Sequence, residues 1–380
     1  MQSIIEYAES EFRTLAEKPF STVDSLILSQ FSYIDFCGVV PGMEESSKTV
    51  RIADCLKAEN FLSMIGETRD PKSNKRLLFA LAASPRFRDI KMTSYVSEFD
   101  PISEKQFSAV TFILPDSCIY IAFRGTDDTL IGWKEDFSMA FVYPVPSQAR
   151  ALEYLLDISK SFSDKIIIVG GHSKGGNLAV YSAFTAPQSV QSRILRVYDH
   201  DGPGFKEGAL DCEGFRQIED RIEKTVPQSS LIGMLLEGHK KYTVVESSRF
   251  GVMQHDPFSW KVSDGAFVTT EEVSDGAKYM NRAIRDWLDQ LSQGDREKFT
   301  DLLFGVLDAG DARTFSEITL EWKKNFYAIF TAIRETDPEM KKFIGELIKD
   351  FGILLIHNLR VKRRLPNDLP PDSQTIIIQN

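Results

Sequence analysis

Cysteine and histidine, which often bind metal ions, are scarce in this sequence. The 380 residues include four cysteines and five histidines, and no two cysteines form a C-x-x-C pair. Scattered cysteines exclude a disulfide framework and a zinc site, and they predict buried thiols in a reducing compartment. We therefore expect a cytoplasmic protein without a metal or other cofactor. The cysteines are Cys37, Cys55, Cys118 and Cys212.

Basic charge and long apolar segments are lacking as well. The formal net charge is −10, from 45 Lys and Arg against 55 Asp and Glu, which argues against a nucleic-acid-binding protein. No stretch reaches 18 uninterrupted apolar residues, so no transmembrane segment is expected, and peripheral contact with a membrane stays open. Residues 1–18 mix Glu with apolar residues, unlike a signal peptide.

What the sequence does contain is an alternation of helical patterns with short β-branched runs. Such an alternation predicts an α/β domain, and a run like 165–171, apolar and bounded by glycine, predicts a buried strand of a parallel sheet. Helices are expected over 3–17, from 23 into a loop at 38–41, and over 74–84, 147–162, 175–186 and 212–226, the last with a short strand at its end. Strands are expected over 89–100, 108–126 (as a pair), 165–171, 194–205 and 241–248.

After about residue 270, the alternation of helix and strand patterns gives way to helical patterns alone. Four successive segments there have apolar residues at spacings of three and four, which predicts a helical subdomain over 271–365. The Pro-rich end predicts a flexible tail over 366–380. The α/β domain, including the N-terminal helices, is accordingly expected over 1–270.

A serine surrounded by glycines follows the predicted strand 165–171. The stretch "VGGHSKGG" contains the pattern G-x-S-x-G, with Ser173 at its centre and a predicted helix directly after it. This order is typical of a nucleophile elbow, where a sharp turn exposes the serine hydroxyl and the helix N-terminus favours an anion. We therefore expect Ser173 to be a nucleophile and the N–H of Lys174 to be one donor of an oxyanion hole.

A serine nucleophile requires a base. His255 lies in a loop after the strand expected at 241–248, which fits the order Ser, acid, His of α/β-hydrolases. His172 adjoins the serine and should point away from it, and His239, between Gly238 and two lysines, is expected to be solvated. His255 is therefore the predicted base.

The acid that orients this base is expected at the end of the strand that begins at residue 194. Asp201 precedes a rigid Gly-Pro-Gly turn that would fix its carboxylate. Asp199, two residues earlier, is the near competitor for this role, and Glu223 is a third option. The stretch "DHD" (199–201) could also bind a metal, but no second ligand cluster supports that interpretation.

Two stretches resemble class 3, fungal-type lipases. "IAFRGTDDTLIGWKEDFSMAF" (121–141) is similar to their F-R-G-[ST] turn with its W-x-x-D-F-like continuation, and "VGGHSKGGNLAVYSAF" (169–184) to their G-H-S-x-G-G-x-L-A elbow. The two motifs stand in the right order, and the resemblance covers residues 108–260. "DGPGF" and "QHDPFSW" also resemble a bacterial branch of lipase-like α/β-hydrolases.

The resemblance implies an α/β-hydrolase fold and roles for several residues. Thr126 would be the second oxyanion residue, and Asp136 and Trp133 would support its loop. The lipase acid usually stands near a D-x-V-P-like turn, but residues 223–227 read "EKTVP", so the acid is expected at Asp201 instead. Lys174 replaces the usual leucine, and its cation would either favour anionic substrate groups or be exposed.

The expected activity is hydrolysis of acyl esters by a Ser173–His255–Asp201 triad, with a small-molecule or lipid ester as the substrate. The alternative is a hydrolase fold that serves as a binding or regulatory module, because fold alone does not determine function. The same triad could also catalyse acyl transfer, or act on thioesters or amides. The sequence does not indicate an oligomeric state.

Overall fold

The computed structural model of the protein describes residues 1–127, 130–139, 142–236, 238–278 and 281. All of these residues belong to one compact unit of the chain, Met1–Ile318. The predicted helical subdomain over 271–365 lies almost entirely outside the described residues, and the predicted tail over 366–380 lies wholly outside them. Both boundaries stay predictions.

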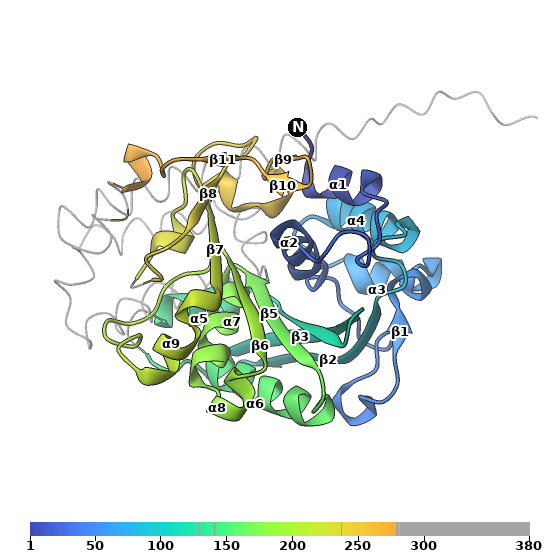
Figure 1. The fold of residues 1–380 in the computed structure, drawn as a ribbon, viewed down its shortest axis with the longest axis horizontal. Coiled ribbons are helices and arrows are strands. Elements are labelled where there is room, and N and C mark those ends of the chain that lie inside the picture. The colour runs from blue at the N-terminus through green and yellow to red at the C-terminus, as the bar shows by residue number, and fades with distance from the viewer. Residues whose placement is uncertain (128–129, 140–141, 237, 279–280, 282–380) are drawn as a thin grey trace, which may run out of the picture. The chain divides into compact units, whose positions relative to one another are not determined.

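A mixed sheet forms the centre of the described structure (Figure 1), with strand order β1-β2-β3-β4-β5-β6-β7-β8-β11. Strands β4 to β8 are parallel, whereas β1 to β4 and the pair β8–β11 are antiparallel. The strands are β1 (Val50–Arg51), β2 (Lys91–Asp100), β3 (Lys105–Leu114), β4 (Cys118–Phe123), β5 (Ile166–His172), β6 (Ile194–His200), β7 (Ile222–Pro227), β8 (Thr243–Val245) and β11 (Thr269–Thr270). Strands β9 (Val262–Ser263) and β10 (Ala266–Phe267) form a separate hairpin.

Helices cover both faces of this sheet, as Figure 1 shows. Those of the described residues are α1 (Ile4–Ser10), α2 (Thr22–Phe31), α3 (Phe61–Ile65), α4 (Pro71–Ala83), α5 (Leu130–Ser138), α6 (Pro146–Ser161), α7 (Lys174–Thr185), α8 (Gln188–Gln191) and α9 (Glu213–Ile218). Alternating side chains of the strands divide the core into two clusters. On β4, Tyr120 and Ala122 pack with α1, α2 and α4, while Ile119 and Ile121 pack with α6, α7 and α9, as the two-residue period of a strand requires.

These elements confirm the prediction of an α/β-hydrolase fold with a largely parallel central sheet flanked by helices. The predicted helix over 3–17 ends at Ser10 instead. Beyond it, the buried guanidinium of Arg86 donates hydrogen bonds to the carbonyls of Arg13 and Lys18. The residues between α1 and Lys18 end in a turn instead, in which the N–H groups of Glu17 and Lys18 donate to the carbonyl of Thr14.

Three further details differ from the predictions. Helix α5 lies within a stretch interpreted as strand and loop, and β7 occupies residues expected to be mainly helical. The thiol of Cys55 is buried, and burial raises its pKa to about 12, but the thiol of Cys37 is exposed. Burial of all four cysteines was therefore a wrong prediction.

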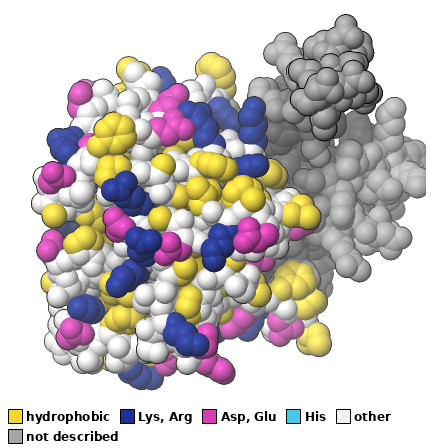
Figure 2. Space-filling view, turned by 90° about the vertical axis from the view of Figure 1, so that its right-hand side faces the viewer, with side chains coloured by type: hydrophobic (Ala, Val, Ile, Leu, Met, Phe, Trp, Pro, Cys, Tyr) yellow, Lys and Arg dark blue, Asp and Glu magenta, His cyan; other side chains and the backbone are white. Residues whose placement is uncertain are grey.

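The surface formed on the side of α1, α3, α4 and β1 is mixed in character. Figure 2 shows hydrophobic side chains scattered among acidic and basic ones on this face. Scattered apolar residues are normal on protein surfaces. Within the described part of the chain, no helix has the length and apolar character needed to cross a bilayer.

Candidate active site

Ser173 lies between the end of β5 and the first residue of α7. Its backbone has φ 59° and ψ −132°, a left-handed conformation that non-glycine residues rarely adopt. Its N–H donates a hydrogen bond of 2.9 Å to the carbonyl of His200, at the end of β6, which fixes the turn to the neighbouring strand. The side chain is half-buried at the carboxyl edge of the parallel strands.

The glycines around Ser173 allow strand and helix to approach. A Cβ on Gly171 would lie 2.2 Å from the carbonyl carbon of Gly175, across the turn. We predict that Gly171→Ala lowers the free energy of unfolding by on the order of 2 kcal/mol, because backbone has to move to admit the methyl group. Chemical denaturation measures this loss. Gly42→Ala, whose Cβ would meet only an ordinary contact of 3.8 Å, is the control, and equal losses would contradict the explanation.

His255 and Asp201 are in direct contact. The Nδ1 of His255 donates a hydrogen bond of 2.6 Å to Oδ2 of Asp201, which is fully buried. The other oxygen of Asp201 accepts hydrogen bonds from the hydroxyl of Ser230 at 2.5 Å and from the N–H of Gly233 at 3.2 Å. Asp201 itself has φ 56°, and its N–H donates to the carbonyl of Thr225 on β7. The carboxylate therefore has a fixed orientation toward the imidazole.

His172, next to the serine, holds His255 in place. Its Nε2 donates a hydrogen bond of 2.8 Å to the carbonyl of His255, and the two rings pack at 4.6 Å between centroids. The hydroxyl of Tyr33 approaches both Nδ1 and the carbonyl of His172 at 3.3 Å. Burial and the nearby imidazole of His255 hold the pKa of His172 well below its usual range, so this ring is neutral.

The loop after β4 lies against the serine. A Cβ on Gly125 would lie 3.2 Å from the Cβ of Ser173 and 2.5 Å from the carbonyl of His172. The next residue, Thr126, donates a hydrogen bond of 2.5 Å from its hydroxyl to Oδ2 of Asp136 on α5. Burial raises the pKa of Asp136 to about 6, against the opposing effect of Lys174. The side chain of Trp133 lies outside what the structure describes.

In the described part of the chain, His255 and Ser173 are linked through His172 and not by a direct hydrogen bond. Within the described residues, no hydrogen bond joins the hydroxyl of Ser173 to His255. His172 connects them, because it adjoins the serine in the chain and contacts His255 through both its ring and its Nε2. Hydrogen bonds between a catalytic serine and histidine often become short only in the complex with substrate.

The side chain of Lys174 does not face the substrate side of the turn. It is fully buried, and its Nζ lies 3.0 Å from Oε2 of Glu135 on α5, which is also buried. Nζ also donates to the carbonyl and to Oε1 of Gln106 at 2.9 and 3.0 Å. The expectations of a cation for anionic substrates and of an exposed side chain were therefore both wrong, because an acid on α5 binds the ammonium group.

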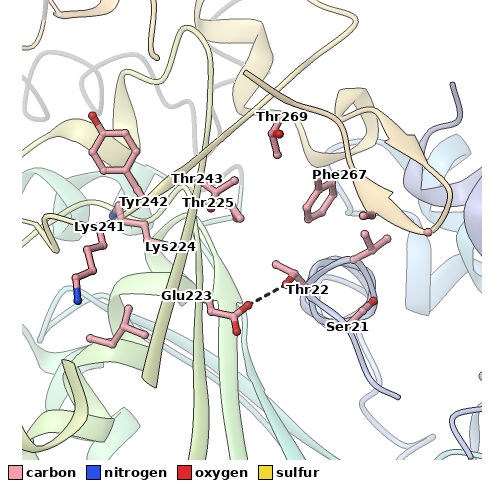
Figure 3. A pocket seen from close by; sticks show the side chains of 14 residues that line it. Ser21, Thr22, Glu223, Lys224, Thr225, Lys241, Tyr242, Thr243, Phe267 and Thr269 are labelled. Carbon is pink, nitrogen blue, oxygen red and sulfur yellow. Dashed lines mark hydrogen bonds between the residues drawn. The ribbon is translucent and has the colours of Figure 1, made fainter. Parts of the chain in front are cut away.

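The two alternative acids have other partners. Oδ2 of Asp199 lies 2.7 Å from Nζ of Lys224, and its Oδ1 accepts from the N–H of Gly202. Glu223 forms an ion pair with Arg196 and accepts a hydrogen bond of 2.9 Å from Thr22. Figure 3 shows this bond in a cavity of about 420 Å³ between α2 and strands β7 and β8. The cavity lining does not include His255 or its partners Asp201 and His172.

The remaining histidines are not placed for catalysis. His200 is fully buried between the hydroxyls of Thr225 and Ser25, and burial lowers its pKa to about 3. His239 is also buried, with Nδ1 at the carbonyl of Lys241, so the expectation of a solvated ring was wrong. His357 lies outside the described residues. Where the chain is described, no group of three or more His, Cys, Asp or Glu could hold a metal ion.

Three residues that contact this site were not predicted. Ser230 binds the acid, Tyr33 binds His172, and Glu135 binds Lys174. No motif marks Ser230 or Tyr33. Glu135 directly precedes Asp136, so a helical interpretation of residues 130–138 would have drawn attention to it.

Comparisons with known proteins found solved structures that are similar to this chain and a family model that matches it. The chain is similar to solved structures of a lipase from Rhizomucor miehei in complex with its propeptide (17% identity, TM-score 0.32, covering 57% of this chain and 77% of that one) and of lipase II from Rhizopus niveus (11%, 0.35, 58% and 77%). A lipase from Yarrowia lipolytica is similar at 13% identity and a TM-score of 0.32, covering 51% and 76%. No curated protein matches the chain. The family model Mbeg1-like matches residues 81–305, more than half of the chain, and this protein therefore belongs to the Mbeg1-like family.

Proposed function

We propose that this protein is a serine hydrolase that cleaves acyl esters. The observation that carries the proposal is the contact of 2.6 Å between His255 and the buried Asp201, beside a serine in a strained turn at a helix N-terminus. A buried carboxylate on Nδ1 leaves Nε2 of the imidazole without a proton, so that Nε2 can accept one from a hydroxyl. A binding module has no need for this arrangement.

In the proposed reaction, Ser173 attacks the carbonyl carbon of the ester while His255 accepts its proton. The tetrahedral intermediate places a negative charge on the former carbonyl oxygen. The N–H of Lys174, the first residue of α7, has no carbonyl partner within the helix and can stabilise that charge together with the N–H of Thr126. The hydroxyl of Thr126 is engaged by Asp136, which keeps this loop in place.

Breakdown of the intermediate gives His255 its second role. The protonated imidazole transfers its proton to the departing alcohol oxygen, and an acyl group remains on Ser173. Water then attacks the acyl-enzyme while His255 accepts a proton from that water, and collapse of the second tetrahedral intermediate returns this proton to the oxygen of Ser173 and releases the carboxylic acid. Asp201 stabilises the imidazolium in both halves of the reaction.

Covalent labelling tests this proposal. A fluorophosphonate probe should react with the wild-type protein, and digestion followed by mass spectrometry should find the modification on the peptide that contains Ser173. Ser173→Ala should not be labelled and should not hydrolyse p-nitrophenyl esters of short or long acids. A folded wild-type protein without label, or a label on another serine, would contradict the proposal.

A further inference from the structure

A buried network links the nucleophile turn to the loop that carries Thr126. Lys174 begins α7, directly after Ser173, and its side chain extends to α5. Glu135 and Asp136 follow one another on α5, with Nζ of Lys174 at 3.0 Å from the first and 3.9 Å from the second. Asp136 in turn accepts the hydrogen bond of Thr126.

The carboxylate of Glu135 is fully occupied. Its Oε2 accepts hydrogen bonds from Lys174 and from the N–H of Gln106 on β3, and its Oε1 accepts one from the N–H of Ser147 on α6. The pair Lys174–Glu135 thus joins four elements of the fold at one point. Buried ions that are paired and fully hydrogen-bonded hold a defined geometry.

Asp136 is held less firmly than Glu135. Its Oδ2 accepts from Thr126, but Oδ1 is a buried atom without a hydrogen-bond partner in the described residues. The ammonium group of Lys174 is the cation near this oxygen, at 3.9 Å. Three other titratable groups face Asp136: Glu135 on the same helix, His255 in the turn Gly251–His255, and Tyr33 after α2.

We propose that Lys174 is a positioning residue of the oxyanion hole: its buried ammonium group ties the nucleophile turn to α5 and keeps Asp136 ionised against the hydroxyl of Thr126. This inference rests on the proposed function. An ionised Asp136 can only accept, so the single proton of the Thr126 hydroxyl points to it. The side chain of Thr126 is then fixed, and its main-chain N–H keeps one direction relative to Ser173.

The test replaces the ion pair by neutral groups of similar size. Lys174→Met combined with Glu135→Gln removes both charges of the pair together and leaves the backbone N–H at position 174 unchanged. We expect kcat for p-nitrophenyl esters to fall by about tenfold to 100-fold with little change in KM, because a displaced oxyanion donor acts on the transition state. A matched control removes another buried ion pair, Arg86 with Asp24, as Arg86→Met and Asp24→Asn, and should retain the wild-type kcat.

The pH profile separates positioning from a merely structural role. Lys174 lowers the pKa of Asp136 and Glu135 raises it, with Lys174 the stronger of the two. Asp136 adds to the acid limb of kcat/KM that protonation of the base His255 produces, so this added contribution should move to higher pH in Lys174→Met/Glu135→Gln and to lower pH in Glu135→Gln alone. When Asp136 is already replaced by Asn, neither Lys174→Met/Glu135→Gln nor Glu135→Gln alone should change kcat or the acid limb of kcat/KM any further.

Each outcome decides the question. A folded double variant with wild-type kcat and an unshifted acid limb would overturn the inference, as would losses that simply add to that of Asp136→Asn. If the double variant does not fold, Glu135→Gln alone provides the test. An acid limb of kcat/KM that is unchanged in this variant, or that moves to higher pH, contradicts the inference. A wild-type protein that neither takes the fluorophosphonate label nor hydrolyses esters would overturn the proposed function instead.

Discussion

Asp201→Asn should lower kcat by about 10⁴-fold while leaving the fold intact. The Asn oxygen can still accept from Ser230 and Gly233, so the buried contacts of Oδ1 remain. The Asn amide group would face Nδ1 of His255 as a donor and would favour the wrong imidazole tautomer. With its proton on Nε2, His255 cannot accept the proton of Ser173. Steady-state kinetics with a p-nitrophenyl ester measures the loss.

The matched control is the same substitution two residues earlier. Asp199→Asn leaves the buried ammonium group of Lys224 without its carboxylate partner, so it should lower the thermal unfolding temperature and change kcat only a few-fold. Asp201→Asn should show the reverse, a nearly unchanged unfolding temperature and a collapsed kcat. If Asp199→Asn had the larger effect on kcat, the assignment of the acid would be wrong.

The elbow was the most predictable part of the candidate site, because its chemistry is local. A buried β-branched run, four glycines and a serine before a helix leave few alternatives for the backbone, and the structure has β5, the turn and α7 where they were expected. Asp201 was chosen from a similar local feature, the end of β6 before a Gly-Pro-Gly turn. The catalytic roles of Ser173, Asp201 and His255 remain proposals that the experiments above test.

Contacts between distant segments were not predictable in the same way. Lys174 meets Glu135 across 39 residues of sequence, and nothing at position 174 itself indicates a buried partner. The strands β1 and β11 have two residues each, too few for an alternation pattern to be visible. Beyond the end of α1, the carbonyls of Arg13 and Lys18 accept hydrogen bonds from Arg86, more than 60 residues away, and no local propensity indicates such a contact.

The second prediction with a large expected effect concerns the stability of the fold at low pH. We predict that His200 makes the fold sensitive to acid, because the ring is neutral when buried, with a pKa of about 3, and titrates near 6.5 in the unfolded chain. The unfolded state therefore binds the proton first, so the contribution of His200 is complete above pH 6.5 and is lost as pH falls from there toward 3. At pH 4.5 the loss is on the order of 2–3 kcal/mol, since each pH unit between the two pKa values contributes about 1.4 kcal/mol.

Comparison of variants isolates this effect from other titrations. Asp136 acts in the opposite direction, because its raised pKa of about 6 makes the folded state bind a proton more tightly between about pH 6 and 4. In urea unfolding at pH 7.5 and 4.5, His200→Gln should lose less stability on acidification than wild type, by roughly 2–3 kcal/mol. Thr225→Val removes a hydrogen bond to the same ring without a titratable group, so it should be destabilised equally at both pH values. If His200→Gln lost as much stability on acidification as wild type, the prediction would be wrong. The hydroxyls of Ser25 and Thr225 would then accommodate the charged ring.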